Sequence, residues 1–294
     1  MVELEYGAPT DKDALAVRFG IAKGFFRREG IDLHLRVIFG GPQLAAAYDA
    51  GTVRLGEIGS PPAVVAIGNG ARFVIVGSGL WRKAHMYFGA RPGITSWEQM
   101  KGKRMGLLTR GSCPEWFIRG MLVSRGLDPD THLIYVALHE EYAKIADCLA
   151  EGRIDAGIMV EPNMSIAEAA GSIRCWGAVY EQPCFPNLQW VVQVARPEFI
   201  QREPELLKTI LRIARISAQY AVENIDEFVA FSSRHFDLPR AIMMRAIQRQ
   251  LGHLNIDGEI DMAGLEEMIK LQQHLGGLKS PLTAYAITDQ RFLN

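Results

Sequence analysis

Strand-like and helix-like patterns of hydrophobic residues alternate from the N-terminus to about residue 195. Residues 2–9, VELEYGAP, alternate polar and apolar positions as a half-buried strand does. Residues 12–28 then carry apolar residues at helical spacing, with Thr10 as the expected N-cap. Further strands are expected at 33–39, 55–58, 73–76, 104–108, 134–137 and 188–195. Strands that alternate with helices predict an α/β fold with mostly parallel sheets.

The last third of the chain has a helical pattern throughout. Helices are expected at Pro204–Val222, Ile225–His235, Pro239–Gln250 and Met262–Leu275. We expect these helices to pack on the part of the molecule that contains the N-terminus.

Two segments of the chain match each other without a gap. Residues 44–70 align with residues 145–171, and each copy reads as a helix, a glycine turn, a short apolar strand and a proline-led helix. The matched pairs include Gly51 with Gly152, Gly56 with Gly157 and Pro61 with Pro162. A repeat of this kind predicts two similar lobes with a ligand in the cleft between them. The alternative is that two βα units share such residues without a common role.

The domain organisation follows from the repeat and from the length of 294 residues, which suits two domains. We expect lobe one to comprise residues 1–90 and 196–294, and lobe two to comprise residues 91–195. The chain would therefore cross between the lobes twice.

Composition narrows the classes of partner. A formal net charge of -1 argues against nucleic acid or an anionic membrane surface as the main partner. No apolar run approaches the ~20 residues of a membrane span, so direct membrane insertion is not expected. The start has no basic segment followed by an apolar core. The expected location is periplasmic or lipid-anchored if a signal was removed, and cytoplasmic if Met1 is the native start.

Four stretches carry a resemblance to a known family. They are FGIAKGFFRREGIDLHLRV, the segment around GSPPA, GKRMGLLTRGSCPEWFIRGMLVSRGLDPD and AEGRIDAGIMVEPNMSIA. Together they resemble the type II periplasmic-binding-protein fold, in the branch with nitrate-, sulfonate- and taurine-binding proteins and the thiamine-pyrimidine-precursor group. The resemblance implies a two-lobed α/β fold, each lobe a mostly parallel sheet flanked by helices. It also implies a solute-binding subunit with an ABC transporter permease as its partner. A minority of the family are cytoplasmic enzymes on the same scaffold.

The resemblance also implies where a ligand would be held. The family's cleft uses the loop after the first strand, two glycine-led helix starts, the lobe-two helix start and the end of the repeat strand. In this chain these positions are Pro9, Thr10, Asp11, Gly40, Gly41, Pro42, Gly59, Ser60, Arg110, Gly111, Ser112, Cys113 and Glu161. Trp81, which follows an expected strand near the hinge, joins this list because an aromatic ring there could stack on an aromatic ligand.

The helix start at Gly111–Cys113 has two interpretations. Free backbone N–H groups and the helix dipole favour a carboxylate, sulfonate or phosphate at such a place, with Arg110 beside it. Ser112 with Glu115 also fits a capping box, which would use the same N–H groups internally.

Other candidate residues also carry alternatives. Cys113 could be a nucleophile with His85 as its base, or a small residue in the cleft wall. Glu161 could accept a hydrogen bond from a ligand amine or pair with an arginine. Trp190 fits the core better than a ligand platform.

Several classes of site have no support in the sequence. Neither a Walker A motif nor a dinucleotide glycine fingerprint occurs, and the seven histidines are scattered. No cofactor and no metal are therefore expected. Two hypotheses follow: a protein that closes two lobes over a small organic anion or an aromatic or heterocyclic ligand, or a cytoplasmic enzyme on the same scaffold with Cys113 in its cleft.

Overall fold

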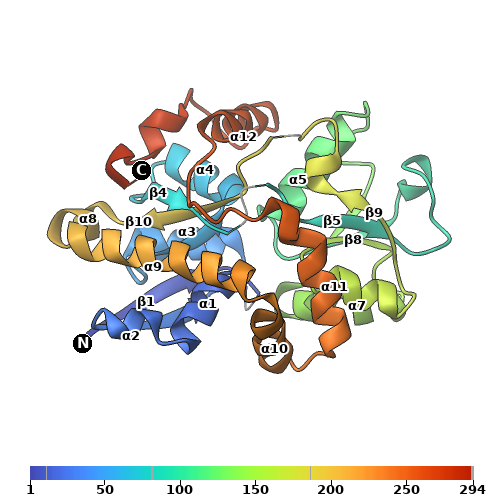
Figure 1. Ribbon diagram of the computed structural model, residues 1–294. Coiled ribbons are helices and arrows are strands. Elements are labelled where there is room, and N and C mark those ends of the chain that lie inside the picture. The colour runs from blue at the N-terminus through green and yellow to red at the C-terminus, as the bar shows by residue number, and fades with distance from the viewer. Residues whose placement is uncertain (11, 81–82, 186, 293–294) are drawn as a thin grey trace.

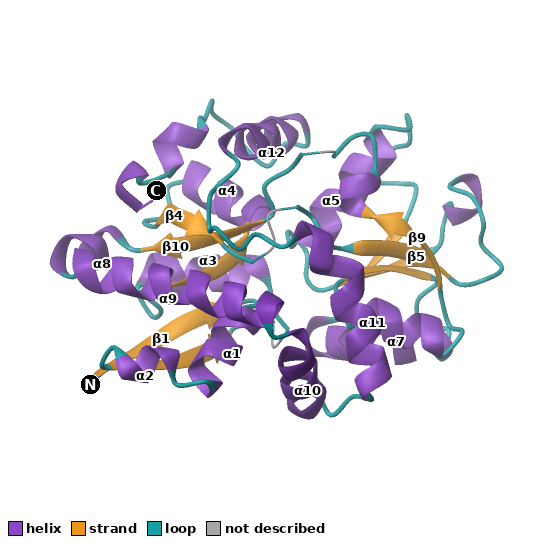
Figure 2. Ribbon diagram, viewed as in Figure 1, coloured by secondary structure: helices purple, strands orange, loops and turns teal. Residues whose placement is uncertain are grey.

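Two five-stranded sheets, each covered by helices, form the two halves of the molecule in the computed structural model (Figures 1 and 2). The structure describes residues 1–10, 12–80, 83–185 and 187–292. Both chain ends lie in the half that contains β1 (Figure 1). We call this half lobe one and the other half lobe two.

The sheet of lobe one has the strand order β2-β1-β3-β10-β4. Its strands are β1 (Val2–Ala8), β2 (Ile31–Val37), β3 (Leu55–Gly59), β4 (Val74–Ser78) and β10 (Val191–Ala195). The β1–β2 and β1–β3 pairs are parallel, whereas β10 pairs antiparallel with β3 and β4. Among these strands four therefore run in one direction, as the alternation of strands and helices predicts.

The sheet of lobe two repeats this plan in the order β7-β6-β8-β5-β9. Its strands are β5 (Tyr87–Ala90), β6 (Arg104–Leu107), β7 (Ile134–Ala137), β8 (Ala156–Met159) and β9 (Arg174–Ala178). Here β5 is the strand that pairs antiparallel with both neighbours. The repeated sequence segments supply β3 and β8, which are the central strands of the two sheets. The predicted two-lobed α/β architecture is confirmed.

The expected lobe boundaries need a correction. Strand β5 pairs with β8 and β9, so Tyr87–Ala90 belong to lobe two rather than to residues 1–90 of lobe one. Strand β10 pairs with β3 and β4, so Val191–Ala195 belong to lobe one. The chain therefore crosses between β4 and β5 and again between β9 and β10. The strand that follows each crossing, β5 or β10, lies between two other strands of its sheet. Both neighbours form hydrogen bonds with its backbone N–H and C=O groups.

The expected helix over residues 12–28 is two helices. Helix α1 spans Leu15–Ala22 and α2 spans Phe25–Arg28, with Gly24 at φ 73° between them. A residue in the left-handed conformation ends a helix, and glycine adopts this conformation without steric cost. Thr10 does not cap α1, because its hydroxyl donates to Asp13 at 2.5 Å and accepts from the Lys12 N–H at 3.2 Å.

The remaining helices flank the sheets. They are α3 (Gly41–Ala50), α4 (Ser60–Gly68), α5 (Cys113–Val123), α6 (Ile145–Ala150), α7 (Asn163–Ala169), α8 (Pro197–Arg202), α9 (Pro204–Glu223), α10 (Ile225–Phe236), α11 (Arg240–Gln250) and α12 (Met262–His274). Short 3-10 helices occupy Glu98–Met100, His139–Lys144, Val179–Glu181, Leu251–His253, Ala284–Ile287 and Gln290–Phe292. Among the described helices, none is both long enough and apolar enough to cross a bilayer.

The sequence predicted that all the C-terminal helices pack on lobe one, and this prediction is wrong for one of them. Helix α9 packs on α1, and α12 packs on α4. Helix α10 contacts α1 and α9, but the next helix, α11, packs against α7 of lobe two (Figure 1). The charge pairs that hold α11 on α7 explain this placement and are described with the site.

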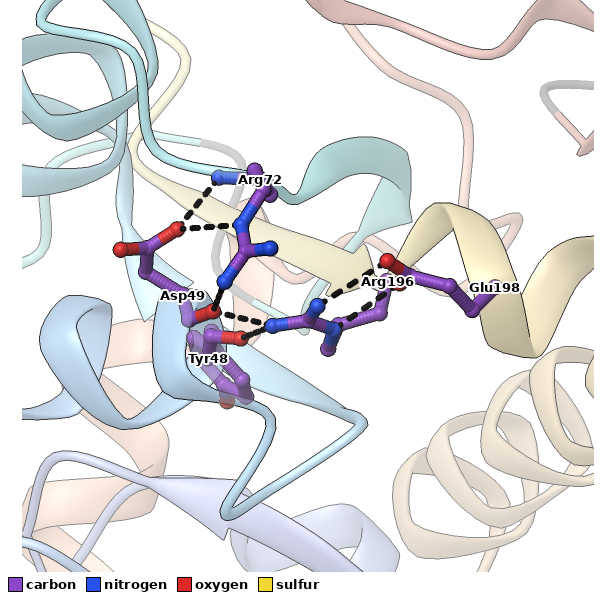
Figure 3. Close-up of polar contacts among 5 residues, drawn as sticks. All are labelled: Tyr48, Asp49, Arg72, Arg196 and Glu198. Carbon is purple, nitrogen blue, oxygen red and sulfur yellow. Dashed lines mark hydrogen bonds and ion pairs between the residues drawn. The ribbon is translucent and has the colours of Figure 1, made fainter.

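A buried arginine ties the end of α3 to the end of β10 in lobe one (Figure 3). Arg196 is 8% exposed and donates to the backbone carbonyls of Tyr48, at 2.9 Å, and Asp49. It also pairs with Glu198 at 3.0 Å. The last carbonyls of a helix have no partner within the helix. A guanidinium that donates hydrogen bonds to them therefore fixes the helix end.

Candidate functional site

A pocket lies where the two lobes meet, and it is the main candidate for a ligand site. Its cavity volume is about 40 Å³ in this structure, and the space between atoms around it, open solvent included, is about 460 Å³. We call it the central pocket. Its lining residues are Pro9, Thr10, Asp13, Gly41, Gly59, Pro62, Met86, Leu108, Ser112, Cys113, Pro114, Tyr142, Val160, Trp190 and Val191. They come from both lobes and from both crossing segments, as a cleft between two similar lobes requires.

Six of the expected ligand-binding residues line this pocket. They are Pro9, Thr10, Gly41, Gly59, Ser112 and Cys113. Asp11 and Trp81 lie outside the described residues. The strand ends and helix starts that the sequence singled out therefore meet at the central pocket. Several other residues that were expected to bind a ligand do not line this pocket.

Two glycines let the lobes approach each other closely across the cleft. A Cβ atom at Gly59 would overlap the Cys113 sulfur of lobe two. A Cβ atom at Gly40, whose φ is 96°, would lie 2.8 Å from Thr109 Oγ1. Real Cβ atoms do not come so near, so both positions require glycine. The lobes are thus in contact in this structure.

Ser60, expected as a ligand contact, makes hydrogen bonds within the protein. Its side chain is fully buried and its hydroxyl donates to the Gln189 carbonyl at 2.5 Å. Its backbone N–H donates to the Trp190 carbonyl at 2.5 Å. Ser60 therefore anchors the start of α4 to the second crossing segment, and both its donors are used there.

The start of α5 is occupied by an internal carboxylate. Glu115, 5% exposed, accepts the Gly111 N–H at 2.6 Å and pairs with Arg110 at 2.7 Å. The Ser112 hydroxyl makes its hydrogen bonds with Thr109 instead of the first helical turn, so the expected capping box does not form. Pro114 supplies no N–H at the second helical position. The expected anion-binding groups of this helix are thus largely used within the protein.

Arg110 does not line the central pocket. Its guanidinium lies over the Tyr135 ring at 4.8 Å in addition to pairing with Glu115. Arg110, Gly111 and Pro42 line a separate groove at the side of the lobe junction. The sequence predicted Arg110 as a ligand residue and could not show that its guanidinium pairs with Glu115.

The environment of Cys113 keeps its thiol protonated. Burial, assisted by the charge of Asp13, raises the pKa of the Cys113 thiol to about 12, although the Trp190 indole lowers that pKa slightly. A thiolate is the reactive form of cysteine, so this thiol is not activated at neutral pH. His85, the suggested base, is fully buried with its ring 4.8 Å from that of Tyr180, and it does not line the central pocket.

Trp190 is the most informative residue that sequence reasoning undervalued. It lies in the second crossing segment, directly before β10, and is 4% exposed. It lines the central pocket, and its indole N–H has no hydrogen bond of normal geometry among the described residues. The neighbouring Cys113 sulfur is a weak acceptor. A buried donor without a good acceptor is costly, so this N–H is a place where a ligand acceptor would stabilise the protein.

Asp13 is a second residue that the sequence did not single out. It lies two residues beyond the loop that the family resemblance identified, in the turn before α1, and lines the central pocket. Its charge raises the pKa values of the buried side chains Glu57, Cys113 and Tyr142. The carboxylate therefore lies close enough to these three side chains to disfavour a negative charge on them.

Glu161 lies at a second pocket, beside the central one, and pairs with an arginine. The Arg249 guanidinium of α11 contacts Glu161 at 2.7 Å and Glu168 of α7 at 2.5 Å. Ser165 donates its N–H and its hydroxyl to Glu161, each at 3.0 Å. Burial raises the pKa of the Glu161 carboxyl, and Arg249 opposes this rise. Of the two sequence interpretations, the arginine partner is the observed one.

A buried acid lies beneath the site in β3. Glu57 is 3% exposed and accepts a hydrogen bond from the Tyr6 hydroxyl at 3.2 Å. Burial and, after it, the charge of Asp13 raise the pKa of Glu57 to about 7. An unfolded glutamate ionises near 4.5, so the folded chain holds this proton more tightly.

Replacement of Glu57 by glutamine is expected to stabilise the protein in a pH-dependent way. Ionised Glu57 destabilises the fold, and the stability present below pH 4.5 is lost as the pH rises to about 7. The variant should therefore match the wild type near pH 4.5 and exceed its free energy of unfolding by up to about 3 kcal/mol at pH 8. Thermal unfolding at both pH values measures this, and an equal difference at the two would contradict the raised pKa.

No group of three or more His, Cys, Asp or Glu side chains among the described residues is arranged to hold a metal ion.

Solved structures with the same two-lobed architecture identify the fold of this chain. The alkanesulfonate-binding protein SsuA from Xanthomonas axonopodis pv. citri, bound to MOPS, aligns over 98% of this chain and 97% of its own with a TM-score of 0.80 and 17% identity. A Candida albicans protein described as having the generic periplasmic binding protein fold aligns over 100% and 97%, with a TM-score of 0.77 and 12% identity. The chain thus has the periplasmic-binding-protein fold.

The family is established by sequence. Residues 14–227 match the family described as NMT1/THI5 like, and the chain belongs to that family. A relative from Brucella abortus (strain 2308), which carries the provisional name of a binding protein, is 22% identical over 277 residues, covering 88% of this chain and 81% of the relative. The resemblance inferred from the four sequence stretches is confirmed at the level of family and fold.

Proposed function

We propose that this chain is the solute-binding component of an ABC-type importer and that it holds one small aromatic or heterocyclic ligand in the central pocket. The family and the fold support the binding role, and the proteins with the same fold include an alkanesulfonate-binding protein and a ligand-binding component of an ABC-type import system. The permease partner rests on this likeness alone.

The observation that carries the ligand class is the buried indole N–H of Trp190. It lines the central pocket and makes no hydrogen bond of normal geometry to any described residue. Most other lining residues are apolar, and the hydroxyls of Ser112 and Tyr142 already donate to backbone carbonyls at 2.5 and 2.7 Å. A flat ring that carries an acceptor atom matches the chemistry of this lining, because apolar side chains would contact the ring while one atom accepts from the indole.

The charge in the pocket favours the heterocyclic ligand over the anionic one. Asp13 is the one charged side chain among the described lining residues. A sulfonate or carboxylate there would lie close to this acid. An amino group on the ring would instead donate to Asp13. A nitrogen heterocycle with an exocyclic amino group, such as an aminopyrimidine, meets both requirements.

Ligand binding would be coupled to closure of the lobes. The pocket wall includes Gly59 of lobe one and Cys113 of lobe two, which touch in this structure. A ligand that contacts both lobes binds the closed state better than the open one, and this difference in affinity is what shifts the population toward closure.

A thermal-shift and calorimetry panel tests the proposal. The probes are 4-aminopyrimidine, aniline, benzoate and benzenesulfonate, which have similar rings but differ in acceptor and charge. We expect 4-aminopyrimidine to raise the melting temperature and to bind with one ligand per chain, and the two anions to have little effect. Stabilisation by benzenesulfonate or benzoate with none by 4-aminopyrimidine would overturn the proposed ligand class.

A further inference from the structure

Helix α11 is attached to lobe one on both sides along the chain. Before it, α10 packs on α1 and α9 of lobe one and also contacts α11. After it, the backbone N–H of Asn255 donates to the Leu80 carbonyl at 2.8 Å, and the Asn255 side chain donates to the hydroxyl of Ser78 in β4 at 2.8 Å. The chain therefore returns to lobe one soon after α11 ends at Gln250.

The second half of α11 is attached to lobe two by charged side chains. Glu168 of α7 pairs with two guanidinium groups, that of Arg249 at 2.5 Å and that of Arg245 at 2.9 Å. Arg249 also pairs with Glu161 at 2.7 Å, and its guanidinium carbon lies 5.2 Å from the centre of the Tyr87 ring in β5. Helix α11 thus links the lobes, with its neighbours along the chain in lobe one and its charge partners in lobe two (Figure 1).

Movement of the lobes would act directly on these ion pairs. Since the chain on either side of α11 is held in lobe one, a rotation of lobe two away from lobe one would separate the arginines from Glu161 and Glu168. The Arg249 and Glu168 side chains are 23% and 19% exposed, whereas Arg245 is 50% exposed. Salt screens such pairs, because the Debye length falls from about 10 Å at 0.1 M to about 3 Å at 1 M.

We propose that α11 is an electrostatic strap that holds the two lobes closed, and that Arg245, Arg249 and Glu168 are positioning residues for ligand binding. None of the three is among the described residues that line the central pocket. Their effect is indirect, since the apparent affinity for a ligand that needs the closed state rises with the fraction of molecules already closed. This link to affinity rests on the proposed function, whereas the contacts between the lobes do not depend on which ligand binds.

Small-angle X-ray scattering of the ligand-free protein tests the strap. In Glu168→Lys a cation faces Arg245 and Arg249, so we expect a larger radius of gyration than in wild type at about 0.1 M salt. The difference should shrink at about 1 M salt, because attraction and repulsion are both screened. Glu140→Lys makes the same change of charge at an exposed position of lobe two and should have the radius of wild type.

Two further variants separate the strap from a loss of folding. Glu168→Lys/Arg245→Glu restores an attraction between α7 and α11 and should return the radius toward that of wild type. Arg245→Met removes only the exposed cation and should enlarge the radius by a smaller amount than Glu168→Lys does. Circular dichroism shows that each variant is folded.

Calorimetry with 4-aminopyrimidine tests the link to affinity. Binding to Glu168→Lys should be about tenfold weaker than binding to wild type, and the double variant should regain most of this loss. Equal radii in wild type, Glu168→Lys and Arg245→Met would overturn the strap, as would an enlarged radius that the charge reversal does not reduce. If the radii change as expected but wild type does not bind 4-aminopyrimidine, the proposed ligand class fails and the strap stands.

Discussion

Replacement of Arg249 by methionine is expected to lower the free energy of unfolding by about 3 kcal/mol at pH 8. The change removes the cation from Glu161, whose side chain is 2% exposed, and leaves a buried carboxylate without its charge partner. Methionine keeps the length and the apolar contacts of the side chain. Chemical denaturation at pH 8 measures the loss.

Two controls separate this effect from a general loss of charge on α11. Arg245→Met removes a guanidinium one turn earlier, whose side chain is 50% exposed, and should cost less than about 1 kcal/mol. The double variant Arg249→Met/Glu161→Gln should regain most of the stability, because no buried charge remains. The deficit of Arg249→Met should also shrink as the pH falls and Glu161 is protonated. Equal losses in Arg245→Met and Arg249→Met would contradict a buried pair.

Replacement of Trp190 by phenylalanine is expected to lower the affinity for 4-aminopyrimidine by about tenfold. Phenylalanine keeps an aromatic wall in the central pocket but removes the indole N–H, so the ring nitrogen of the ligand loses its donor. Isothermal titration calorimetry of wild type and variant measures the difference.

Aniline provides the matched control for Trp190, because it has the same ring size and amino group without a ring nitrogen. Its affinity should be the same in wild type and Trp190→Phe. A tenfold loss for aniline as well would mean that the substitution acts through the shape of the pocket, and an unchanged affinity for 4-aminopyrimidine would remove the indole N–H from the site.

Much of the fold could be predicted because the sequence repeats a structural unit. The segments that align at residues 44–70 and 145–171 supply β3 and β8, which occupy the same central place in two sheets of matching order. The lobe boundaries were wrong by one strand at each crossing. Short apolar strands such as β5 and β10 carry no local signal of the sheet they join, since pairing is decided by tertiary contacts.

The candidate site was predictable in its location but not in its chemistry. Backbone positions such as Gly41 and Gly59 lie where strand ends and helix starts must meet, and both line the central pocket. Side-chain roles depended on long-range partners that spacing does not reveal. Glu115 pairs with Arg110, Arg249 comes from 88 residues away to bind Glu161, and Ser60 is used by the segment before β10.

The crystal structure of the protein with 4-aminopyrimidine tests most directly whether the cleft between the lobes is the ligand site. We expect the ring in the central pocket between Trp190 and Cys113, with a ring nitrogen at hydrogen-bond distance, roughly 2.7–3.2 Å, from Trp190 Nε1 and the amino group directed at Asp13. A ring bound in the side groove next to Arg110, or an empty central pocket under conditions where calorimetry shows saturation, would contradict it.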